Sequence, residues 1–351
     1  MAEPQSAACR AAVITDIARV LQLYPLPELA GKRIFMTGGT GFIGYWLLMT
    51  LAQLNAQGAH TSVVVLSRNP SRFLQRYPEF NTATWLQFIS GDVRDYPIPE
   101  GKFDLFIHGA ADTSPDAAHH ARELFDTITR GTQRVLDHAV VCGSPRVLMI
   151  SSGAIYGEQP SEVSHIPENA PYACSSTDPV DAYAEGKRAM EMLAVCYGRE
   201  YGIEPVIARC FAFVGYGLPP HLAVGQLINN ALADGRIVIT GDGKTVRSYL
   251  YAADLAVWLL ALVSKGKSGV PYNVGSDEAF RLDELAQLIG ETLDVDNAVT
   301  ILGHTKSARR IRYVPDVSRI RQDIGVEIWT GMTTGIKRMA CDSHFNCERS
   351  L

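Results

Sequence analysis

Three polar residues in the middle of the chain have the types and the spacing needed for proton transfer. Tyr183 and Lys187 lie one helical turn apart in Tyr183-Ala-Glu-Gly-Lys187, and Ser152 precedes them by about 30 residues. On a helix this spacing puts the tyrosine and the lysine on one face. A free tyrosine has a pKa of about 10 and is a poor base, but a nearby ammonium group favours its phenolate. We therefore expect Tyr183 to move a proton with help from Lys187, while Ser152 orients the substrate oxygen.

A glycine-rich loop far upstream predicts what accompanies that proton. Residues 37–44 read Thr-Gly-Gly-Thr-Gly-Phe-Ile-Gly and join an expected strand to an expected helix. In such a loop the glycines permit a tight turn, close approach of the backbone to a pyrophosphate, and close packing of the helix on the strand. The helix N-terminus then faces the phosphate charge. The pattern predicts a nicotinamide dinucleotide bound by Gly38, Gly41, Phe42, Ile43 and Gly44.

The end of the second strand bears on which dinucleotide is bound. An acidic residue there would hold the ribose of NAD, but the sequence places Arg68 and Arg72 in this stretch and no carboxylate. Arg68 could pair with the 2′-phosphate of NADP, which slightly favours NADP. The alternative is that Arg68 stacks over adenine and discriminates little. Asp92, after the third strand, could accept a hydrogen bond from the adenine amino group or could be an ordinary turn residue.

Strands and helices alternate along the first two thirds of the chain. Short apolar strands are expected at 32–36, 63–66, 86–89, 105–108, 147–150 and 206–208, with helices at 42–57, 119–142 and 184–201. This alternation predicts an α/β fold with a Rossmann-type doubly wound parallel sheet. We expect an N-terminal extension (1–30, with a helix at 11–23), a dinucleotide-binding domain (31–208, rejoined by about 245–275), a smaller interleaved C-terminal substrate lobe (209–244 and 276–340) and a tail (341–351).

Composition excludes several classes of function. The net charge is −5 and Lys and Arg are scattered, so no nucleic-acid partner is expected. No apolar run approaches the roughly 20 residues that cross a membrane, and we expect a cytoplasmic protein with no membrane partner. Seven cysteines without a C-x-x-C pair predict reduced thiols. The spacing of Cys341, His344 and Cys347 fits no common zinc pattern, so no metal is expected.

Together these motifs resemble the extended short-chain dehydrogenase/reductases of the NAD-dependent epimerase/dehydratase family, which act on nucleotide sugars. The resemblance covers about residues 31–340 and also rests on the stretches 91–93, 108–111, 241–249 and 272–275. It implies that Ser152, Tyr183 and Lys187 are catalytic. It adds Val93, Ala110, Ala111 and Lys187 to the cofactor contacts, and Thr113, Ser152, Arg247 and Tyr249 as substrate contacts. Arg247 would hold the diphosphate, with Arg309 or Arg310 near a second such position. The helices at 119–142 and 184–201 would form a homodimer interface.

A departure from the family pattern bears on the reaction. Dehydratases and decarboxylases of this family usually carry ionisable residues just after the catalytic hydroxyl residue, whereas this chain has Gly153 and Ala154. Eliminating water needs both a base and an acid, and neither residue can act as one. We therefore rank a nucleotide-sugar C4 epimerase with NAD first, an NADPH-dependent nucleotide-4-keto-sugar reductase second, and a 4,6-dehydratase or decarboxylase last. Intact Ser152, Tyr183 and Lys187 argue against a catalytically silent dinucleotide sensor.

Overall fold

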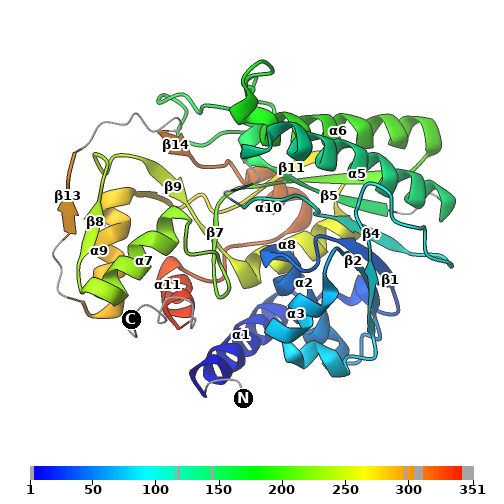
Figure 1. Ribbon diagram of the computed structural model, residues 1–351, viewed down its shortest axis with the longest axis horizontal. Coiled ribbons are helices and arrows are strands. Elements are labelled where there is room, and N and C mark those ends of the chain that lie inside the picture. The colour runs from blue at the N-terminus through cyan, green and yellow to red at the C-terminus, as the bar shows by residue number, and fades with distance from the viewer. Residues whose placement is uncertain are drawn as a thin grey trace.

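A sheet of seven parallel strands forms the centre of the protein (Figure 1). The computed structural model describes residues 4–114, 116, 119–143, 146–295, 299–303 and 311–341. The strand order is β3-β2-β1-β4-β5-β6-β11, with β1 (Arg33–Thr37), β2 (Ser62–Ser67), β3 (Leu86–Ser90), β4 (Leu105–His108), β5 (Arg146–Ser152), β6 (Glu204–Cys210) and β11 (Pro271–Val274). Strands β1, β2, β4 and β5 are almost wholly buried, as expected for apolar strands covered on both faces. The order reverses between β1 and β4, where open parallel sheets bind their ligands.

Helices cover both faces of the sheet, which confirms the predicted doubly wound α/β fold. One face carries α5 (Ala121–Val141) and α6 (Ala182–Tyr201), which lie side by side in Figure 1. The other face carries α2 (Phe42–Ala56) and α8 (Ala252–Lys265), with α3 (Pro70–Arg76) beside β3 and α10 (Ser318–Ile324) beside β11. Single 3-10 turns occur at η1 (Pro27–Leu29), η2 (Pro78–Thr82), η3 (Gly153–Tyr156) and η4 (Pro179–Asp181).

A smaller lobe lies to one side of this sheet, on the left of Figure 1. The chain leaves the sheet after β6, returns to it for α8 and β11, and leaves it again. The lobe contains α7 (Ala223–Asp234), α9 (Leu282–Leu293), α11 (Met332–Ala340) and the short strands β8 (Ile237–Ile239), β9 (Val246–Ser248), β12 (Ala279–Arg281), β13 (Val299–Ile301) and β14 (Arg312–Tyr313). Strand β9 lies between β12 and β14, β8 pairs with β13, and β7 (Phe213–Val214) pairs with β10 (Leu250–Tyr251).

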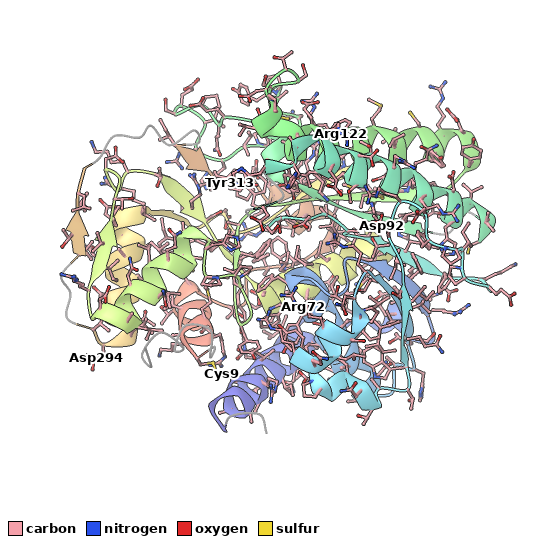
Figure 2. The ribbon with its side chains drawn as sticks, in the orientation of Figure 1. Cys9, Arg72, Asp92, Arg122, Asp294 and Tyr313 are labelled. Carbon is pink, nitrogen blue, oxygen red and sulfur yellow. A yellow bond between two sulfur atoms is a disulfide. The ribbon has the colours of Figure 1, made fainter. Side chains whose placement is uncertain are left out.

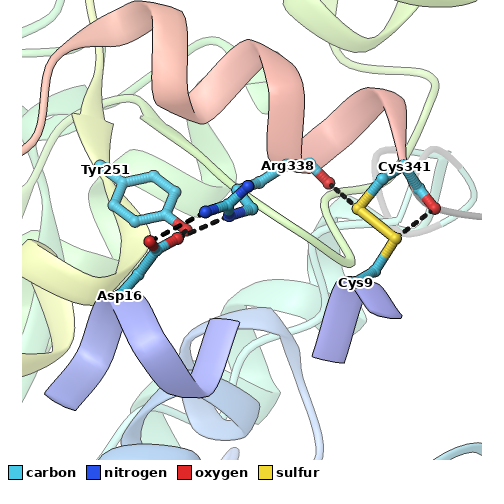
Figure 3. Close-up of a disulfide and its surroundings, with 5 residues drawn as sticks. All are labelled: Cys9, Asp16, Tyr251, Arg338 and Cys341. Carbon is cyan, nitrogen blue, oxygen red and sulfur yellow. Dashed lines mark hydrogen bonds and ion pairs between the residues drawn. A yellow bond between two sulfur atoms is a disulfide. The ribbon is translucent and has the colours of Figure 1, made fainter. Parts of the chain in front are cut away.

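The first helix, α1 (Pro4–Leu23), is an integral layer of the fold. It packs on α2 and α8 and also reaches α11 (Figure 1). Asp16 of this helix is largely buried, and its carboxylate accepts hydrogen bonds from the Tyr251 hydroxyl at 2.7 Å and from the Arg338 guanidinium at 2.6 and 3.0 Å (Figure 3). A paired buried carboxylate of this kind fixes α1 against both β10 and α11.

The expectation that every cysteine is reduced is wrong for one pair. Cys9 in α1 and Cys341 at the end of α11 form a disulfide with Cα atoms 6.0 Å apart (Figure 3). In the described part of the chain Cys142, Cys174, Cys196 and Cys210 are free thiols, and Cys347 lies outside it. The two bonded cysteines are 332 residues apart, so their proximity depends on the tertiary fold and not on any local spacing.

Within the described ranges no helix is both long and apolar enough to span a membrane. The same residues contain no cluster of three or more His, Cys, Asp or Glu side chains arranged to hold a metal ion. His344, Cys347, Arg309 and Arg310, which the sequence analysis singled out, lie outside the described residues.

Candidate active site

The glycine loop connects β1 to α2 at the point where the strand order reverses. Gly38 has a φ of +74°, and a Cβ there would lie 2.6 Å from the backbone of Gly109 after β4. A Cβ on Gly44 would lie 2.4 Å from the Gly38 carbonyl oxygen. The loop is therefore folded tightly enough to exclude side chains at both positions. This cradle beside a helix N-terminus suits a pyrophosphate.

The other predicted residues of the loop and of the β4 end lie around this cradle. Phe42, the first residue of α2, stacks on Phe213 with ring centroids 5.0 Å apart, and Ile43 is half-buried beside it. After β4 the Ala110 amide donates to the Thr37 hydroxyl at 3.3 Å. Ala111 follows and is half-buried. The cofactor-binding candidates of β1, α2 and β4 thus meet at one edge of the sheet.

Ser152, Tyr183 and Lys187 meet at the carboxyl end of β5. Ser152 is the last residue of this strand, and its hydroxyl accepts a hydrogen bond from the Ala154 amide at 3.1 Å. Tyr183, in the first turn of α6, packs against a small buried cluster that includes Ala154. Lys187 donates from Nζ to the Ile150 carbonyl oxygen at 2.7 Å, and its Nζ lies 5.8 Å from the centre of the Tyr183 ring. The structure thus brings the three predicted catalytic residues together.

Lys187 has an unusual electrostatic environment. Its side chain is 2% exposed, and burial lowers its pKa to about 8, while Cys210 and Glu191 act in the opposite direction. Desolvation disfavours the charged form of a buried amine. An ammonium near its protonation midpoint at mildly alkaline pH can respond to small changes in the charge around it.

The ends of β2 and β3 beside the cradle contain ion pairs that the sequence did not predict. Arg68 follows β2, is 72% exposed, and lies 3.5 Å from the carboxylate of Asp112, which follows β4. Because β1 lies between β2 and β4, this pair spans the end of β1 above the glycine loop. Both carboxylate oxygens of Asp92 accept hydrogen bonds from Arg94 at 2.9 Å, which lowers the Asp92 pKa. Val93 packs its side chain against Gly131 of α5.

The predicted substrate contacts lie on the smaller lobe and on the loop after β4. Arg247 is in β9, where its Nη1 donates to the Val246 carbonyl oxygen at 2.8 Å. Tyr249 is buried, which raises its pKa to about 12. Thr113 is exposed beyond β4. Arg247 and Tyr249 therefore lie on the smaller lobe, whereas Thr113 lies on the loop after β4.

The space beside Gly153 is occupied by aromatic side chains. A Cβ at this position would lie 2.7 Å from the Phe211 ring and 2.7 Å from the Tyr313 hydroxyl oxygen. The two rings contact each other with centroids 4.5 Å apart. Tyr313 is in β14, paired in register with Arg247 of β9 (Figure 2 labels Tyr313 where the lobes meet). An ionisable side chain in place of Gly153, which the family resemblance implied for a dehydratase or decarboxylase, therefore has no room here.

Sequence reasoning missed a buried polar network beneath the catalytic residues. Its centre is Glu191, one turn beyond Lys187 on α6, which accepts from the Ser151 hydroxyl at 2.5 Å and pairs with Arg209 of β6 at 2.8 Å. Arg209 also donates to the Tyr156 hydroxyl at 2.8 Å. The four-residue spacing of Tyr183, Lys187 and Glu191 along one helix face was the signal that could have indicated Glu191.

The comparison with protein families identifies this arrangement. The chain matches the model of the "NAD dependent epimerase/dehydratase family" over residues 34–275. It therefore belongs to this family, as its motifs suggested. The matched region contains the glycine loop, Ser152, Tyr183, Lys187 and Arg247.

Individual relatives are similar along most of the chain. UDP-glucuronic acid decarboxylase 1 of Arabidopsis thaliana is 29% identical over 320 residues, which cover 88% of this chain and 69% of the relative. A probable dTDP-glucose 4,6-dehydratase of Sinorhizobium fredii is 26% identical and covers 87% and 91%. The dTDP-glucose 4,6-dehydratase DesIV of Streptomyces venezuelae, solved with NAD bound, superposes with a TM-score of 0.75 at 26% identity and covers 90% and 97%.

These names change the order of the predicted reactions. The epimerase was ranked first from Gly153 and Ala154, and the dehydratase or decarboxylase was ranked last. The relatives above are decarboxylases and dehydratases, so the reactions ranked last are the better supported. The prediction treated dehydration and decarboxylation alike as needing ionisable residues directly after Ser152, and it therefore placed both reactions last.

Proposed function

We propose that the protein is an NAD- or NADP-dependent enzyme that oxidises the sugar of a nucleotide-diphosphate sugar at C4. The observation that carries this proposal is the meeting of Ser152, Tyr183 and Lys187 at the end of β5, beside a glycine cradle. The cradle fits a dinucleotide because its glycines leave backbone amides open to a phosphate. Residues 209–244 and 276–340 are proposed to bind the sugar nucleotide together with Arg247 of β9, which would contact its diphosphate.

The protein residues have distinct tasks in this oxidation. A bound nicotinamide dinucleotide would supply the hydride chemistry, that is, removal of a hydride from the sugar carbon and its later return. Tyr183 as phenolate takes the proton of the C4 hydroxyl while Ser152 donates a hydrogen bond to the same oxygen. Lys187, through its positive charge, stabilises the phenolate. The product of this step is a 4-keto sugar.

Gly153 and Ala154 favour decarboxylation over loss of water as the step that follows. Removing water from the keto sugar requires a base at C5 and an acid for the leaving hydroxyl. A 4-keto uronic acid instead releases CO2 when its C5–C6 bond breaks, and the bonding electrons pass into the ketone, so no base has to take a proton from C5. One later protonation at C5, with solvent water as the proton source, completes the step. The crowding of Gly153 by Phe211 and Tyr313 is compatible with this smaller requirement.

Product analysis tests the proposal directly. Purified protein is incubated with NAD or NADP and, separately, with UDP-glucuronate, dTDP-glucose and UDP-glucose, and each product is identified by mass and NMR. We expect CO2 loss from UDP-glucuronate. Loss of water from dTDP-glucose would favour the dehydratase, and an inverted C4 centre without mass change would favour the epimerase. Turnover of none of the three would contradict the assignment to these sugar nucleotides.

A variant of the proposed base separates chemistry from binding. Tyr183→Phe removes only the phenolic hydroxyl, and we expect it to lower turnover by about 10²–10⁴-fold while the dinucleotide dissociation constant stays nearly unchanged. Activity within a few-fold of wild type would contradict the proton-transfer role.

We also propose that the protein forms a homodimer through α5 and α6. Met192 and Val195 lie one turn apart on α6 and are 65% and 42% exposed, and Phe125 on α5 is 39% exposed. Exposed apolar side chains grouped on adjacent helices are typical of interaction surfaces. Analytical ultracentrifugation should find a species of twice the chain mass, and a monomer at all concentrations would contradict this proposal.

A further inference from the structure

We propose that Glu191 is a positioning residue, which fixes Ser152 and Lys187 relative to each other and keeps the Lys187 ammonium charged. This inference rests on the proposed function for the roles of Ser152 and Lys187. Glu191 itself is 9% exposed and lies beneath the proposed reaction centre, not in it.

Two adjacent residues of β5 are bonded to two successive turns of α6. The Ile150 carbonyl oxygen accepts from Lys187 Nζ at 2.7 Å, and the Ser151 hydroxyl donates to Glu191 at 2.5 Å. Ser152 is the next residue on the strand. The bond to Glu191 therefore sets the register between the strand that ends in Ser152 and the helix that carries Lys187.

Arg209 extends this control to the turn after Ser152. Its guanidinium makes a two-pronged ion pair with Glu191, with nitrogen–oxygen distances of 2.8–3.3 Å. It also donates to the hydroxyl of Tyr156 at 2.8 Å, and Tyr156 ends the 3-10 turn that begins directly after Ser152. Ser152 is thus held from the residue before it and from the turn after it, and both links run through Glu191.

The charge of Lys187 depends on the titratable groups around it. The titratable groups that face Lys187 are Tyr183 and Glu191 on α6, His108 on β4 and Cys210 on β6. Burial lowers the pKa of His108 to about 3 and raises that of Cys210 to about 12, so both are neutral near pH 7. Among the described residues that face Lys187, Glu191 is therefore the one that supplies negative charge independently of Tyr183.

Removing this charge while keeping the shape has a specific consequence. In Glu191→Gln the amide oxygen can still accept from Ser151, but the ammonium of Lys187 loses its nearby anion. We expect Lys187 to lose its proton about 1 pH unit lower than in wild type. The alkaline limb of the kcat–pH profile with UDP-glucuronate and NAD should move to lower pH by the same amount.

A second measurement needs neither cofactor nor substrate. The free energy of unfolding of the cofactor-free protein is measured for wild type and for Lys187→Met. The same two measurements are then repeated for proteins that also carry Glu191→Gln. The protein with Lys187 should begin to gain stability relative to Lys187→Met at a pH about 1 unit lower when Glu191→Gln is present. Coincident onsets in the two backgrounds would overturn the electrostatic part of the proposal.

Matched variants separate charge from structure. Ser151→Ala removes the strand–helix bond and keeps the Glu191 charge, so it should lower kcat without moving the alkaline limb. Glu168→Gln alters another buried carboxyl, which accepts from the Asn273 amide at 2.9 Å and does not face Lys187, so it should leave the limb in place. A shift in Glu168→Gln equal to that in Glu191→Gln would refute a specific role for Glu191.

Two further outcomes keep the test decisive. If Glu191→Gln does not fold because Arg209 is left unpaired, Glu191→Asp, which keeps the charge but shortens the side chain, replaces it. That variant must lower kcat and leave the alkaline limb in place, and a shifted limb contradicts the proposal. If Tyr183→Phe retains turnover, the proposed function is wrong. If it abolishes turnover while Glu191→Gln shows no shift, only the present inference fails.

Discussion

The buried charge of Lys187 lowers the free energy of unfolding, and the size of this effect can be measured. Its side chain is 2% exposed and packs between α6 and the sheet, with the Ile150 carbonyl oxygen as its hydrogen-bond acceptor. Burial lowers its pKa to about 8 from an ordinary value of 10.5. The perturbation is Lys187→Met, which keeps most of the side-chain volume and removes the titrating amine.

The magnitude and sign follow from proton linkage. Between pH 8 and 10.5 the unfolded chain holds a proton on Lys187 that the folded protein has released, so the stability of wild type rises with pH in this window. At about 1.4 kcal/mol per pH unit, the full change is about 3 kcal/mol. Below pH 8 both states carry the proton, and the difference between wild type and Lys187→Met is constant.

Urea unfolding at a series of pH values tests this expectation. The free energy of unfolding of wild type minus that of Lys187→Met should rise by about 3 kcal/mol from pH 7.5 to pH 10.5, which is about 1 M urea in the midpoint. Lys267→Met is the control, because the bond to Asp323 raises the Lys267 pKa, so its difference should stay flat up to about pH 10.5 and fall only above it. A flat or falling difference for Lys187→Met would refute the argument.

Three other substitutions follow from close contacts and charges. Gly153→Ala should lower the free energy of unfolding, measured by chemical denaturation, by about 1–3 kcal/mol, because its Cβ would lie 2.7 Å from the Phe211 ring. Gly241→Ala is the control, since a Cβ there would have no atom within 4 Å, and it should change the free energy of unfolding by less than about 0.5 kcal/mol. Gly44→Ala should weaken dinucleotide binding at least about tenfold in a fluorescence titration, since its Cβ would lie 2.4 Å from backbone; an unchanged dissociation constant would show that the cradle does not hold the cofactor. Arg68→Ala should lower any preference for NADP over NAD by about tenfold, and an unchanged ratio of dissociation constants would favour the stacking alternative.

Local patterns predicted the parts of the fold that depend on neighbouring residues. Continuous apolar runs marked β1, β2 and β5 because strands covered on both faces need no polar positions. The glycine loop was visible because its turn and its close contacts occur within eight consecutive residues. Tyr183 and Lys187 were found together because one helical turn separates them.

Contacts between distant segments could not be predicted in this way. Glu191 shares the helix face of Lys187, but its partners Ser151 and Arg209 come from two other elements, and no local spacing relates them. Tyr313 reaches Gly153 only because β14 pairs with β9. The sequence could show that Gly153 is not an acid, but only the structure shows what fills the space.

Helix α8 has no side open to solvent. Every residue from Ala252 to Val263 is buried, because the helix contacts the sheet, α2 in its own layer, and α1. In a layered α/β fold the outer helices normally carry a polar face. In this protein α1 carries the solvent-exposed face in place of α8. A family member that begins at the equivalent of β1 must therefore either carry polar residues along the exposed face of this helix or cover it with another chain. The composition of that one helix should thus reveal, in any relative, whether an additional layer lies outside it.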